Sequence, residues 1–492
     1  MAHAARFHFL GCGVGMGMLM TSLIAGEPLG AGERLAVHYP WDGSVTGEVV
    51  MCGVEDAERA VEIGLRGGKR LTRHERAEVL RRAADLLDAR VEEHARLIRV
   101  ETGLSAFDCR AEASRAGMIL RFAAMEALRE EGMVWPGDVT PAGFARKLFT
   151  VREPVRLALA ITPFNHPLTQ CAHKVGPAIA AGAALILKPS EKTPLTALTF
   201  AALLYEAGLP GWMLSCLVGP LEPVVGGLVR DGRIEALTFT GSAGAGRAIS
   251  GMAGLKKTCY ELGGNAEMIV LEDADMELAV RLGAEGSYRN SGQRCTAVKR
   301  FLVARRLAGE FAERLAAETE RVFPWGDPGE EATRVGTVIS EAAARQLEGY
   351  VREAVAGGAE VLCGGERRGA LMMPTVLRGV ARTAALMREE AFGPLSPVVA
   401  VDGLDEAVEI CNESRYGLAT SVMTRDLGSA LAVVERVRTG MVQVNEVPAW
   451  RLEHTPFGGI KESGPGVKEG VAEAVKFYGQ VKSFSLPWPG GM

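Results

Sequence analysis

Four short segments place reactive side chains next to glycines and prolines that form turns. In chain order they are Pro163-Phe164-Asn165-His166-Pro167, Glu261-Leu262-Gly263-Gly264, Gly292-Gln293-Arg294-Cys295 and Glu390-Ala391-Phe392-Gly393-Pro394. Among these side chains, the thiolate of Cys295 is the strongest nucleophile, and a thiolate is the form of cysteine that attacks a carbon atom. The residue types therefore suit covalent attack on a carbonyl group.

Cys295 is one of nine cysteines, and a single cysteine is usually a small packing residue. Two features reverse that expectation. The adjacent cation of Arg294 favours the thiolate, and the three other segments supply further reactive side chains. Addition of the thiolate to an aldehyde would give a thiohemiacetal. The oxyanion of that intermediate needs fixed hydrogen-bond donors.

The four segments, in this order, resemble the aldehyde dehydrogenase superfamily, and the resemblance runs from about residue 23 to the C-terminus. It implies that the side-chain amide of Asn165 and the backbone N–H of Cys295 bind the oxyanion. It also implies hydride transfer to a nicotinamide dinucleotide, which leaves a thioester on Cys295. Water would hydrolyse this thioester with Glu261 as the general base. The sequence thus predicts an NAD(P)-dependent aldehyde dehydrogenase.

A glycine-containing turn is the candidate site for the cofactor diphosphate. Gly241, Ser242 and Gly246 follow a strand that ends at Thr240. Glycines let the backbone approach a diphosphate, while the next helix presents its N-terminus to the negative charge. The segment is not a G-x-G-x-x-G fingerprint, and the superfamily is known for this departure.

The rest of the cofactor site is implied by the resemblance. The segment around Lys188 and Glu191 would hold the ribose hydroxyls of the adenosine, and Glu390 and Phe392 would hold the ribose and ring on the nicotinamide side. The carboxylate of Glu191 would repel a 2′-phosphate, which favours NAD over NADP. The predicted residues besides the glycine turn are Lys188, Ser190, Glu191, Leu262, Glu390 and Phe392.

Cationic side chains near the four segments indicate an anionic substrate, because guanidinium groups bind phosphate-type oxygens in forked geometry. The predicted substrate-binding residues are His166, Arg294, Arg451 and Arg110, with Arg115 as a further candidate. Within the superfamily, the stretches around Cys295 and Arg451 and the tail look most like the phosphonoacetaldehyde dehydrogenases. This likeness predicts NAD-dependent oxidation of phosphonoacetaldehyde or phosphonoformaldehyde to the carboxylate.

Other activities remain open at this point. Glu267 stands where the superfamily usually has a proline, and the bulk of Trp450 lies near the expected entrance to the site. The first alternative is a dehydrogenase of succinate semialdehyde, lactaldehyde or glyceraldehyde 3-phosphate with the same catalytic residues. A remote alternative is a non-catalytic structural member of the same fold.

Composition narrows the class of protein. The 492 residues are 48% hydrophobic and 23% charged, as in ordinary globular proteins. The net charge of −5 and the lack of a basic block argue against nucleic acid as a partner. The cysteines form no Cys-x-x-Cys pair, so we expect reduced thiols in the cytoplasm and no metal site. The apolar range 7–25 resembles a signal peptide, but Met16, Met18 and Met20 favour an overlong start, and no membrane association is predicted.

Strand and helix patterns alternate from about residue 150 onward. Short buried runs predict strands at 155–161, 183–187, 214–218, 236–239, 268–271 and 300–303. Amphipathic stretches predict helices at 168–181, 194–207, 276–287, 307–322, 341–356 and 404–412. Upstream, Thr72 and Glu75 form a capping box that opens a long helix reaching residue 98. The alternation predicts an α/β fold with a doubly wound, Rossmann-like cofactor domain and a second α/β domain, and ligands at the carboxyl ends of the strands.

The predicted domain division has three parts. Residues 1–127 and 151–262 form the NAD-binding domain, residues 263–440 the catalytic domain, and residues 128–150 and 476–492 a β arm for oligomerisation. The tail alternates in strand fashion over 481–486, and a lone terminal strand needs a partner. The resemblance to the superfamily implies a homodimer or a homotetramer.

Overall fold

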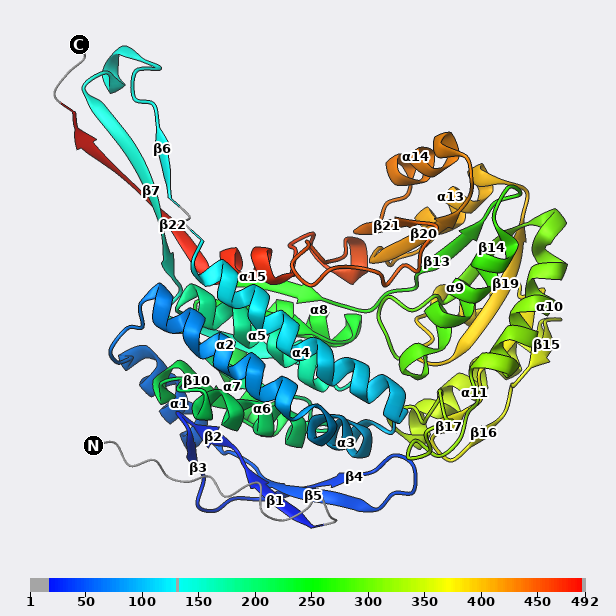
Figure 1. The fold of residues 1–492 in the computed structure, drawn as a ribbon, viewed down its shortest axis with the longest axis horizontal. Coiled ribbons are helices and arrows are strands. Elements are labelled where there is room, and N and C mark those ends of the chain that lie inside the picture. Colours follow the sequence, from blue (N-terminus) through cyan, green and yellow to red (C-terminus); the bar gives the residue numbers. More distant parts are fainter. Residues whose placement is uncertain (1–16, 130–131, 489–492) are drawn as a thin grey trace.

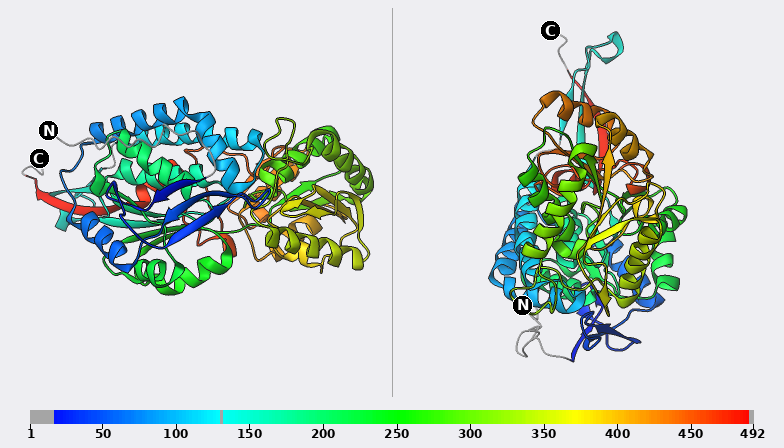
Figure 2. Two further views of the ribbon diagram at one scale, coloured as in Figure 1. Left: turned by 90° about the horizontal axis from the view of Figure 1, so that it is seen from below. Right: turned by 90° about the vertical axis from the view of Figure 1, so that its right-hand side faces the viewer.

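The computed structural model describes residues 17–129 and 132–488. Two α/β lobes lie side by side, and a β arm extends away from the first lobe (Figure 1). Viewed from below, the two lobes form one elongated body (Figure 2). The residues that could do chemistry lie where the two lobes meet.

The first lobe is built on a seven-stranded sheet. Its order is β12 (Lys257–Glu261), β11 (Ala236–Thr240), β8 (Leu157–Ile161), β9 (Ala184–Lys188), β10 (Leu214–Cys216), β2 (Leu23–Ile24) and β3 (Glu27–Pro28). The first five strands are parallel, and the two N-terminal strands pair antiparallel at the edge. The chain turns sharply between β2 and β3, where Ala25 and Gly26 both have positive φ.

Helices cover both faces of this sheet, which confirms the doubly wound fold. Alternate residues of β8 point to opposite sides: Leu157 and Leu159 pack with α1 and α8, whereas Ala158 and Ala160 pack beneath α2 to α6. Strands buried on both faces read as continuous apolar runs, as observed here. The helices are α1 (Val54–Arg66), α2 (Arg73–Ala89), α3 (Val91–Thr102), α4 (Ala106–Ala127), α5 (Pro167–Ala181), α6 (Pro194–Glu206), α7 (Gly226–Arg230) and α8 (Ala243–Ala253).

The long helix predicted from residue 73 to residue 98 is two helices. Its start is confirmed, because Thr72 and Glu75 cap the N-terminus of α2 reciprocally. The helix ends at Ala89, where the N–H of Arg90 bonds to the carbonyl of Leu87 and tightens the last turn. Arg90 also pairs with Glu206 at 2.6 Å, which anchors this corner to α6. Apolar periodicity continues through the break, so the pattern alone did not reveal it.

The second lobe contains another seven-stranded sheet. Its order is β15 (Glu360–Cys363), β18 (Thr375–Arg378), β19 (Leu395–Val401), β14 (Arg300–Ala304), β13 (Glu267–Val270), β20 (Ala419–Met423) and β21 (Met441–Val444). Two separate apolar cores flank it, one on each face. The flanking helices are α9 (Met276–Tyr288), α10 (Arg305–Val322), α11 (Glu341–Ala356), α12 (Ala385–Arg388), α13 (Leu404–Glu413) and α14 (Leu427–Arg436).

The chain returns to the first lobe after β21. Residues 441–475, which the predicted division leaves unassigned, contribute β21 to the second sheet and α15 (Val471–Phe477) to the first lobe, where α15 packs on α4 and α5. A small hairpin, β16 (Arg367–Arg368) and β17 (Leu371–Met372), and a three-stranded sheet of β1 (Met18–Thr21), β5 (Val45–Val50) and β4 (Arg34–His38) complete the body.

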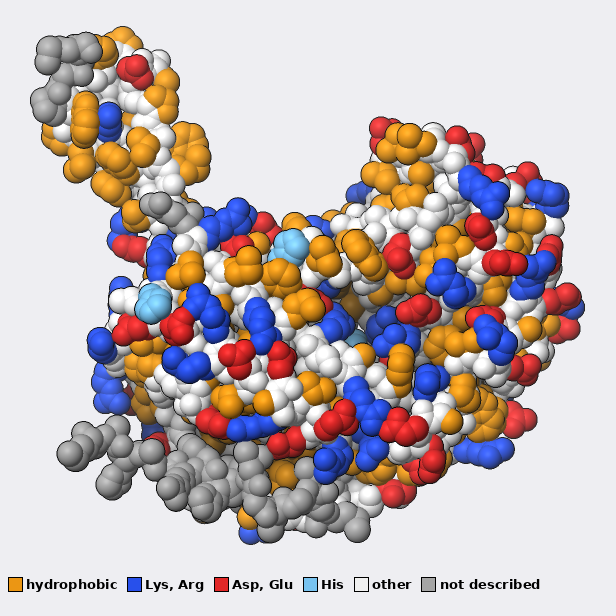
Figure 3. Space-filling view, in the orientation of Figure 1, with side chains coloured by type: hydrophobic (Ala, Val, Ile, Leu, Met, Phe, Trp, Pro, Cys, Tyr) orange, Lys and Arg blue, Asp and Glu red, His pale blue; other side chains and the backbone are white. Residues whose placement is uncertain are grey.

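The arm is a three-stranded antiparallel sheet. It orders β22 (Gly479–Pro487), β7 (Arg146–Pro154) and β6 (Met133–Trp135), so the C-terminal strand pairs with a segment more than 300 residues earlier in the chain. Hydrophobic side chains gather on the arm (Figure 3). Those most exposed include Met133, Val134, Val139 and Val481.

The carboxyl ends of the strands of the first sheet face the second lobe. Thr240 of β11 and Glu261 of β12 are register partners at this edge, and the chain after Ile161 of β8 turns there into α5. Among the described residues, no helix has the length and apolarity to cross a membrane.

Candidate active site

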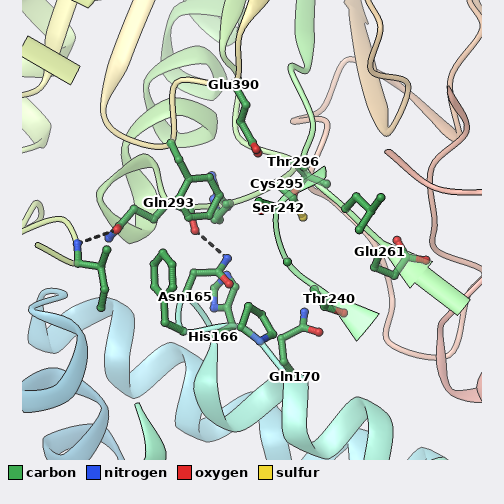
Figure 4. A pocket seen from close by; sticks show the side chains of 18 of the residues that line it. Asn165, His166, Gln170, Thr240, Ser242, Glu261, Gln293, Cys295, Thr296 and Glu390 are labelled. Atoms are coloured by element: carbon green, nitrogen blue, oxygen red, sulfur yellow. Dashed lines mark hydrogen bonds between the residues drawn. The ribbon is translucent and has the colours of Figure 1, made fainter. Parts of the chain in front are cut away.

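The structure brings the four segments together around one pocket at the junction of the two lobes. Asn165, Glu261, Cys295 and Glu390 all line it. Figure 4 shows their side chains converging from different elements, with the sulfur of Cys295 and the carboxylate of Glu261 in the same cavity. Of the eight cysteines that the structure describes, seven are buried, and Cys295 alone is partly exposed.

A strained turn between α9 and β14 presents Cys295. Asn290 and Ser291 adopt left-handed φ angles of 61° and 51°, which cost energy for residues with a side chain. Gly292 follows with φ of 69°, and a Cβ there would lie 2.3 Å from the carbonyl oxygen of Gly393. Only glycine allows this close approach, which joins the segment of Cys295 to the segment of Glu390.

Contacts from α4 hold this turn. Asp108 accepts a hydrogen bond from the backbone N–H of Asn290 at 2.7 Å and forms an ion pair with Arg289. The Nδ2 of Asn290 then donates to the carbonyl of Asn165 at 3.0 Å. The turn that carries the nucleophile and the turn that carries the predicted oxyanion donor are therefore linked through Asn290.

Glu112 lies one helical turn after Asp108 on the same face of α4 and holds the second turn. Its Oε1 accepts from the N–H groups of Leu168 and Thr169 at 2.9 and 3.1 Å, which caps the N-terminus of α5. Its Oε2 lies 3.4 Å from the Nδ1 of His166. Asp108 and Glu112 were missed at the sequence level. The signal that could have found them is two acids spaced i,i+4, which lie on the same face of a helix together with apolar residues.

Asn165 has the geometry of an oxyanion donor. Its Nδ2 donates to the carbonyl of Gln293 at 2.8 Å, and an amide nitrogen carries a second hydrogen. Gln293 is itself fixed, because its Oε1 accepts from the N–H of Ile339 at 2.9 Å (Figure 4). The amide of Asn165 is thus oriented before any substrate binds.

The thiol of Cys295 rests in its protonated form. Burial, and then the carboxylates of Glu390 and Glu261, raise the pKa of Cys295 to about 12, while Arg451 and Lys299 lower it. Arg294 is predicted from the sequence to favour the thiolate, but its Nη2 turns back and donates to the carbonyls of Glu285 and Gly286 at 3.1 and 2.7 Å. The thiol therefore needs a base to remove its proton.

Glu261 at the end of β12 has the properties of such a base. It is buried, and neither carboxylate oxygen has a hydrogen-bond partner among the described residues. Burial and the nearby charge of Glu469 raise the pKa of Glu261 well above 4.5, while Lys174 opposes this shift. A carboxylate with a raised pKa and free oxygens can accept a proton near neutral pH.

The predicted diphosphate site is the N-terminus of α8. Ser242 caps this eleven-residue helix by accepting from the N–H of Ala245 at 3.3 Å. A Cβ on Gly244 would meet nothing within 4 Å, so open space lies over the first turn, as a bound diphosphate requires. A Cβ on Gly246 would lie 2.4 Å from a methyl carbon of Leu262, so a glycine is needed for α8 to approach that residue.

The other predicted cofactor residues lie on both sides of this loop. Lys188 at the end of β9 forms an ion pair with Glu191, and Ser190 accepts from the N–H of Lys192 at 3.2 Å. These three residues lie outside the pocket of Cys295, whereas Gly241, Ser242 and Leu262 line it. The arrangement fits a dinucleotide that runs from β9 across the N-terminus of α8 into the pocket.

Glu390 and Phe392 line the inner end of this path. The Oε1 of Glu390 accepts from the N–H of Gly264 at 3.0 Å, and the ring of Phe392 meets that of Phe164 edge-on at 5.9 Å. Burial raises the pKa of Glu390 to about 7, although Lys299 opposes the shift. Lys299 was missed at the sequence level; it is buried four residues after Cys295 and donates to the carbonyl of Gly292 at 2.5 Å.

The predicted substrate cations divide into two groups. His166, Arg294 and Arg451 line the pocket, together with Arg115. Arg110 does not; it is a correction to the prediction, because its guanidinium lies on the surface and pairs with Glu92 and Glu331 at 3.0 and 2.7 Å. Five positions on a helix turn the side chain by about 140°, so Arg110 and Arg115 cannot face the same cavity.

Arg451 lines the pocket and has one donor that no described residue uses. Its guanidinium lies 4.1 Å from the centroid of Phe457, and its Nη2 lies 3.3 Å from the Nε2 of His173. Its Nη1 is buried and has no hydrogen-bond partner among the described residues. A buried guanidinium nitrogen without a hydrogen-bond partner is costly unless a ligand supplies the acceptor.

In residues 17–129 and 132–488, no group of three or more His, Cys, Asp or Glu side chains could hold a metal ion.

The doubly wound sheet, the open N-terminus of α8 and the partly exposed cysteine in the pocket suit an oxidoreductase with a dinucleotide cofactor. A model of the aldehyde dehydrogenase family matches residues 29–484. The chain belongs to the aldehyde dehydrogenase family, and it is an NAD(P)-dependent enzyme.

Three similar proteins illustrate the range of the family. A 3-sulfolactaldehyde dehydrogenase of Priestia aryabhattai is 37% identical over 454 residues, which cover 92% of this chain and 95% of that protein. A mitochondrial succinate-semialdehyde dehydrogenase of Arabidopsis thaliana is 34% identical over 481 residues, with 96% and 90% covered. The crystal structure of aldehyde dehydrogenase 21 from Physcomitrella patens with the reaction product succinate is 32% identical, with a TM-score of 0.93 and coverage of 97% and 100%.

The first prediction concerns the base. Glu261 acts only when deprotonated, so its raised pKa places the fall of kcat on acidification well above pH 4.5. Glu261→Gln should remove this acidic limb and slow thioester hydrolysis by roughly 100-fold or more. Stopped-flow detection of NADH should then show a burst of one equivalent per active site, provided that hydride transfer, which also needs the thiol proton removed, stays faster than hydrolysis. An unchanged kcat in Glu261→Gln would remove Glu261 from this role; Glu331→Gln, at the exposed pair with Arg110, is the control.

The second prediction concerns the turn that carries the nucleophile. Asp108→Asn loses the ion pair with Arg289 and weakens the hold on Asn290, so kcat/KM for the aldehyde should fall by about 10- to 100-fold. The KM for NAD should stay the same, because Asp108 touches no residue of the cofactor site. The matched control is Asp85→Asn, an exposed acid of α2 that pairs with Arg121. Equal kinetics for Asp108→Asn and the native enzyme would contradict the prediction.

Proposed function

We propose that this protein oxidises a small aldehyde with an anionic group at its far end, using NAD. The observation that carries the proposal is the buried, unpartnered Nη1 of Arg451 in the wall of the pocket that contains Cys295. Arg115 adds a second guanidinium to the same pocket. A carboxylate, sulfonate or phosphonate would supply the missing acceptor.

The proposed roles of the catalytic residues follow from the geometry. Glu261 takes the thiol proton of Cys295, the sulfur adds to the aldehyde carbon, and the oxyanion binds the amide of Asn165 and the backbone N–H of Cys295. Bound NAD accepts the hydride. Glu261 then activates the water that hydrolyses the thioester and releases the acid.

The named relatives support an anionic substrate. The sulfolactaldehyde and succinate-semialdehyde dehydrogenases described above are named for aldehydes that carry a sulfonate or a carboxylate. The phosphonate aldehydes predicted from the sequence, and glyceraldehyde 3-phosphate, belong to the same wider class. Lactaldehyde, a neutral aldehyde, would leave the Nη1 of Arg451 without an acceptor.

A kinetic comparison tests the anionic class. The native enzyme should have a kcat/KM for succinate semialdehyde or sulfolactaldehyde at least about tenfold above that for butanal, which lacks the anion. Arg451→Gln should reduce this ratio to near one by raising the KM for the anionic aldehydes. Arg110→Gln, on the surface, should leave the ratio as it is. A native enzyme that prefers butanal, or an Arg451→Gln enzyme with an unchanged ratio, would refute the proposal.

We also propose that the arm joins two or more copies of this chain in the cytoplasm. Its exposed apolar side chains, with Val134 65% and Leu486 47% exposed, favour burial against another surface. β22 and β6 leave open sheet edges, and β21 leaves one on the second lobe. The eight free cysteines suit a reducing compartment.

Light scattering during gel filtration measures the assembly. The native protein should elute as a dimer or a larger even assembly, and Val134→Lys combined with Leu486→Lys should shift it toward the monomer. Val139→Lys, also on the arm but outside its strands, is a milder companion variant. A monomeric native protein would overturn the proposal.

A further inference from the structure

A buried carboxylate lies behind the wall of the pocket that Arg115, His173 and Arg451 form. The Oε1 of Glu453 accepts from the Nε and Nη2 of Arg115 at 2.9 and 2.6 Å, and its Oε2 lies 2.7 Å from the Nε2 of His173. The Nη2 of Arg451 lies 3.8 Å from the same Oε2. The side chain of Glu453 is 6% exposed and does not itself line the pocket.

These four side chains come from three separate parts of the chain. Arg115 belongs to α4, His173 to α5, and Arg451 and Glu453 to the segment after β21. Without Glu453, the two guanidinium groups would repel each other across the wall. The carboxylate therefore both positions the two arginines and offsets one of their charges.

The charges of this wall can be assigned one by one. Arginine side chains are always cationic in proteins. Burial lowers the pKa of His173, and this effect exceeds the opposing effect of Glu453, which raises it. The imidazole is therefore neutral. Burial opposes ionisation of Glu453, but the hydrogen bond from His173 and the two arginines hold its pKa below its usual value. Two cations and one anion leave the wall with a single net positive charge.

Two other charged side chains near this wall, Glu469 and Arg294, differ in their partners. Glu469, which acts on both Arg451 and His173, pairs with Lys174 at 2.5 Å and accepts from the hydroxyl of Thr238 at 2.9 Å. Arg294 also lines the pocket and remains a cation, because its Nη2 donates only to the neutral backbone carbonyls of Glu285 and Gly286 at the end of α9. Glu453 is thus the carboxylate that sets how much charge Arg115 and Arg451 offer to a ligand.

We infer that Glu453 determines substrate specificity by tuning this wall to head groups with one negative charge, a carboxylate or a sulfonate, over those with two, a phosphonate or a phosphate. This inference rests on the proposed function of the pocket as the site of an anionic aldehyde. A singly charged head group balances the wall. A doubly charged group exceeds the charge of this wall by one, and that excess is left to the more distant Arg294 and to solvent, which is less favourable than direct pairing.

The test compares three aldehydes with native enzyme and NAD. They are succinate semialdehyde, phosphonoacetaldehyde and butanal, assayed at about pH 8.5, where a phosphate-type group carries two charges. The native enzyme should have a higher kcat/KM for succinate semialdehyde than for phosphonoacetaldehyde. In Glu453→Gln the wall gains one positive charge, so the ratio of phosphonoacetaldehyde to succinate semialdehyde should rise by about tenfold.

Three further variants separate charge from structure. Glu331→Gln makes the same change of charge on the surface and should leave the ratio unchanged. Glu453→Asp keeps the charge but shortens the side chain, so it should slow all three aldehydes and keep the native ratio. Arg115→Gln removes one positive charge, so it should shift the ratio toward succinate semialdehyde. This variant tests the inference even where Glu453→Gln does not fold.

The possible outcomes are distinct. An enzyme that handles butanal as well as succinate semialdehyde would overturn the proposed function itself. An enzyme that prefers the anionic aldehydes but keeps its ratio of phosphonoacetaldehyde to succinate semialdehyde in both Glu453→Gln and Arg115→Gln would overturn only the inference. Equal losses for all three aldehydes in Glu453→Gln would make Glu453 a structural support without influence on specificity.

Discussion

The proposed nucleophile, Cys295, belongs to one lobe, while the proposed base and the proposed oxyanion donor belong to the other. The hydrogen bond from the N–H of Asn290 to Asp108 joins the two lobes. Asp108 lies on α4 of the first lobe and holds the turn before Cys295 at 2.7 Å. Asn290 passes this restraint on to Asn165. The three left-handed residues of the turn would relax without such contacts, so the catalytic geometry depends on them.

Burial of carboxylates is the second feature that the chemistry uses. Glu261, Glu390 and Glu453 are all removed from water, yet they behave differently because their partners differ. Glu261 has no hydrogen bond among the described residues and becomes a base, whereas Glu453 has three donors and stays ionised. The same type of side chain is therefore suited to proton transfer where it lines the pocket, and to charge balance where it lies behind the pocket wall.

Much of the fold could be predicted from local patterns. The apolar runs of β8, β9 and β11, the capping box at Thr72 and the alternating tail strand have physical causes that act within a few residues. The start of α5 is similar, since Pro167 suits a first helical position. The break at Arg90 could not be predicted, because the apolar spacing continues through it and a distant residue, Glu206, anchors the corner.

The sequence by itself determined which residue types could act and the class of reaction, since Cys295, Glu261 and Asn165 stand in short segments with their own turns. Only the tertiary structure decided which charges meet. Arg110 and Arg115 are equivalent in type, and the direction of α4 sends one to the surface and the other into the pocket. Glu453 and His173 are 280 residues apart in the chain and 2.7 Å apart in the fold. Electrostatic interactions depend on distance in space, and the folded chain alone sets that distance.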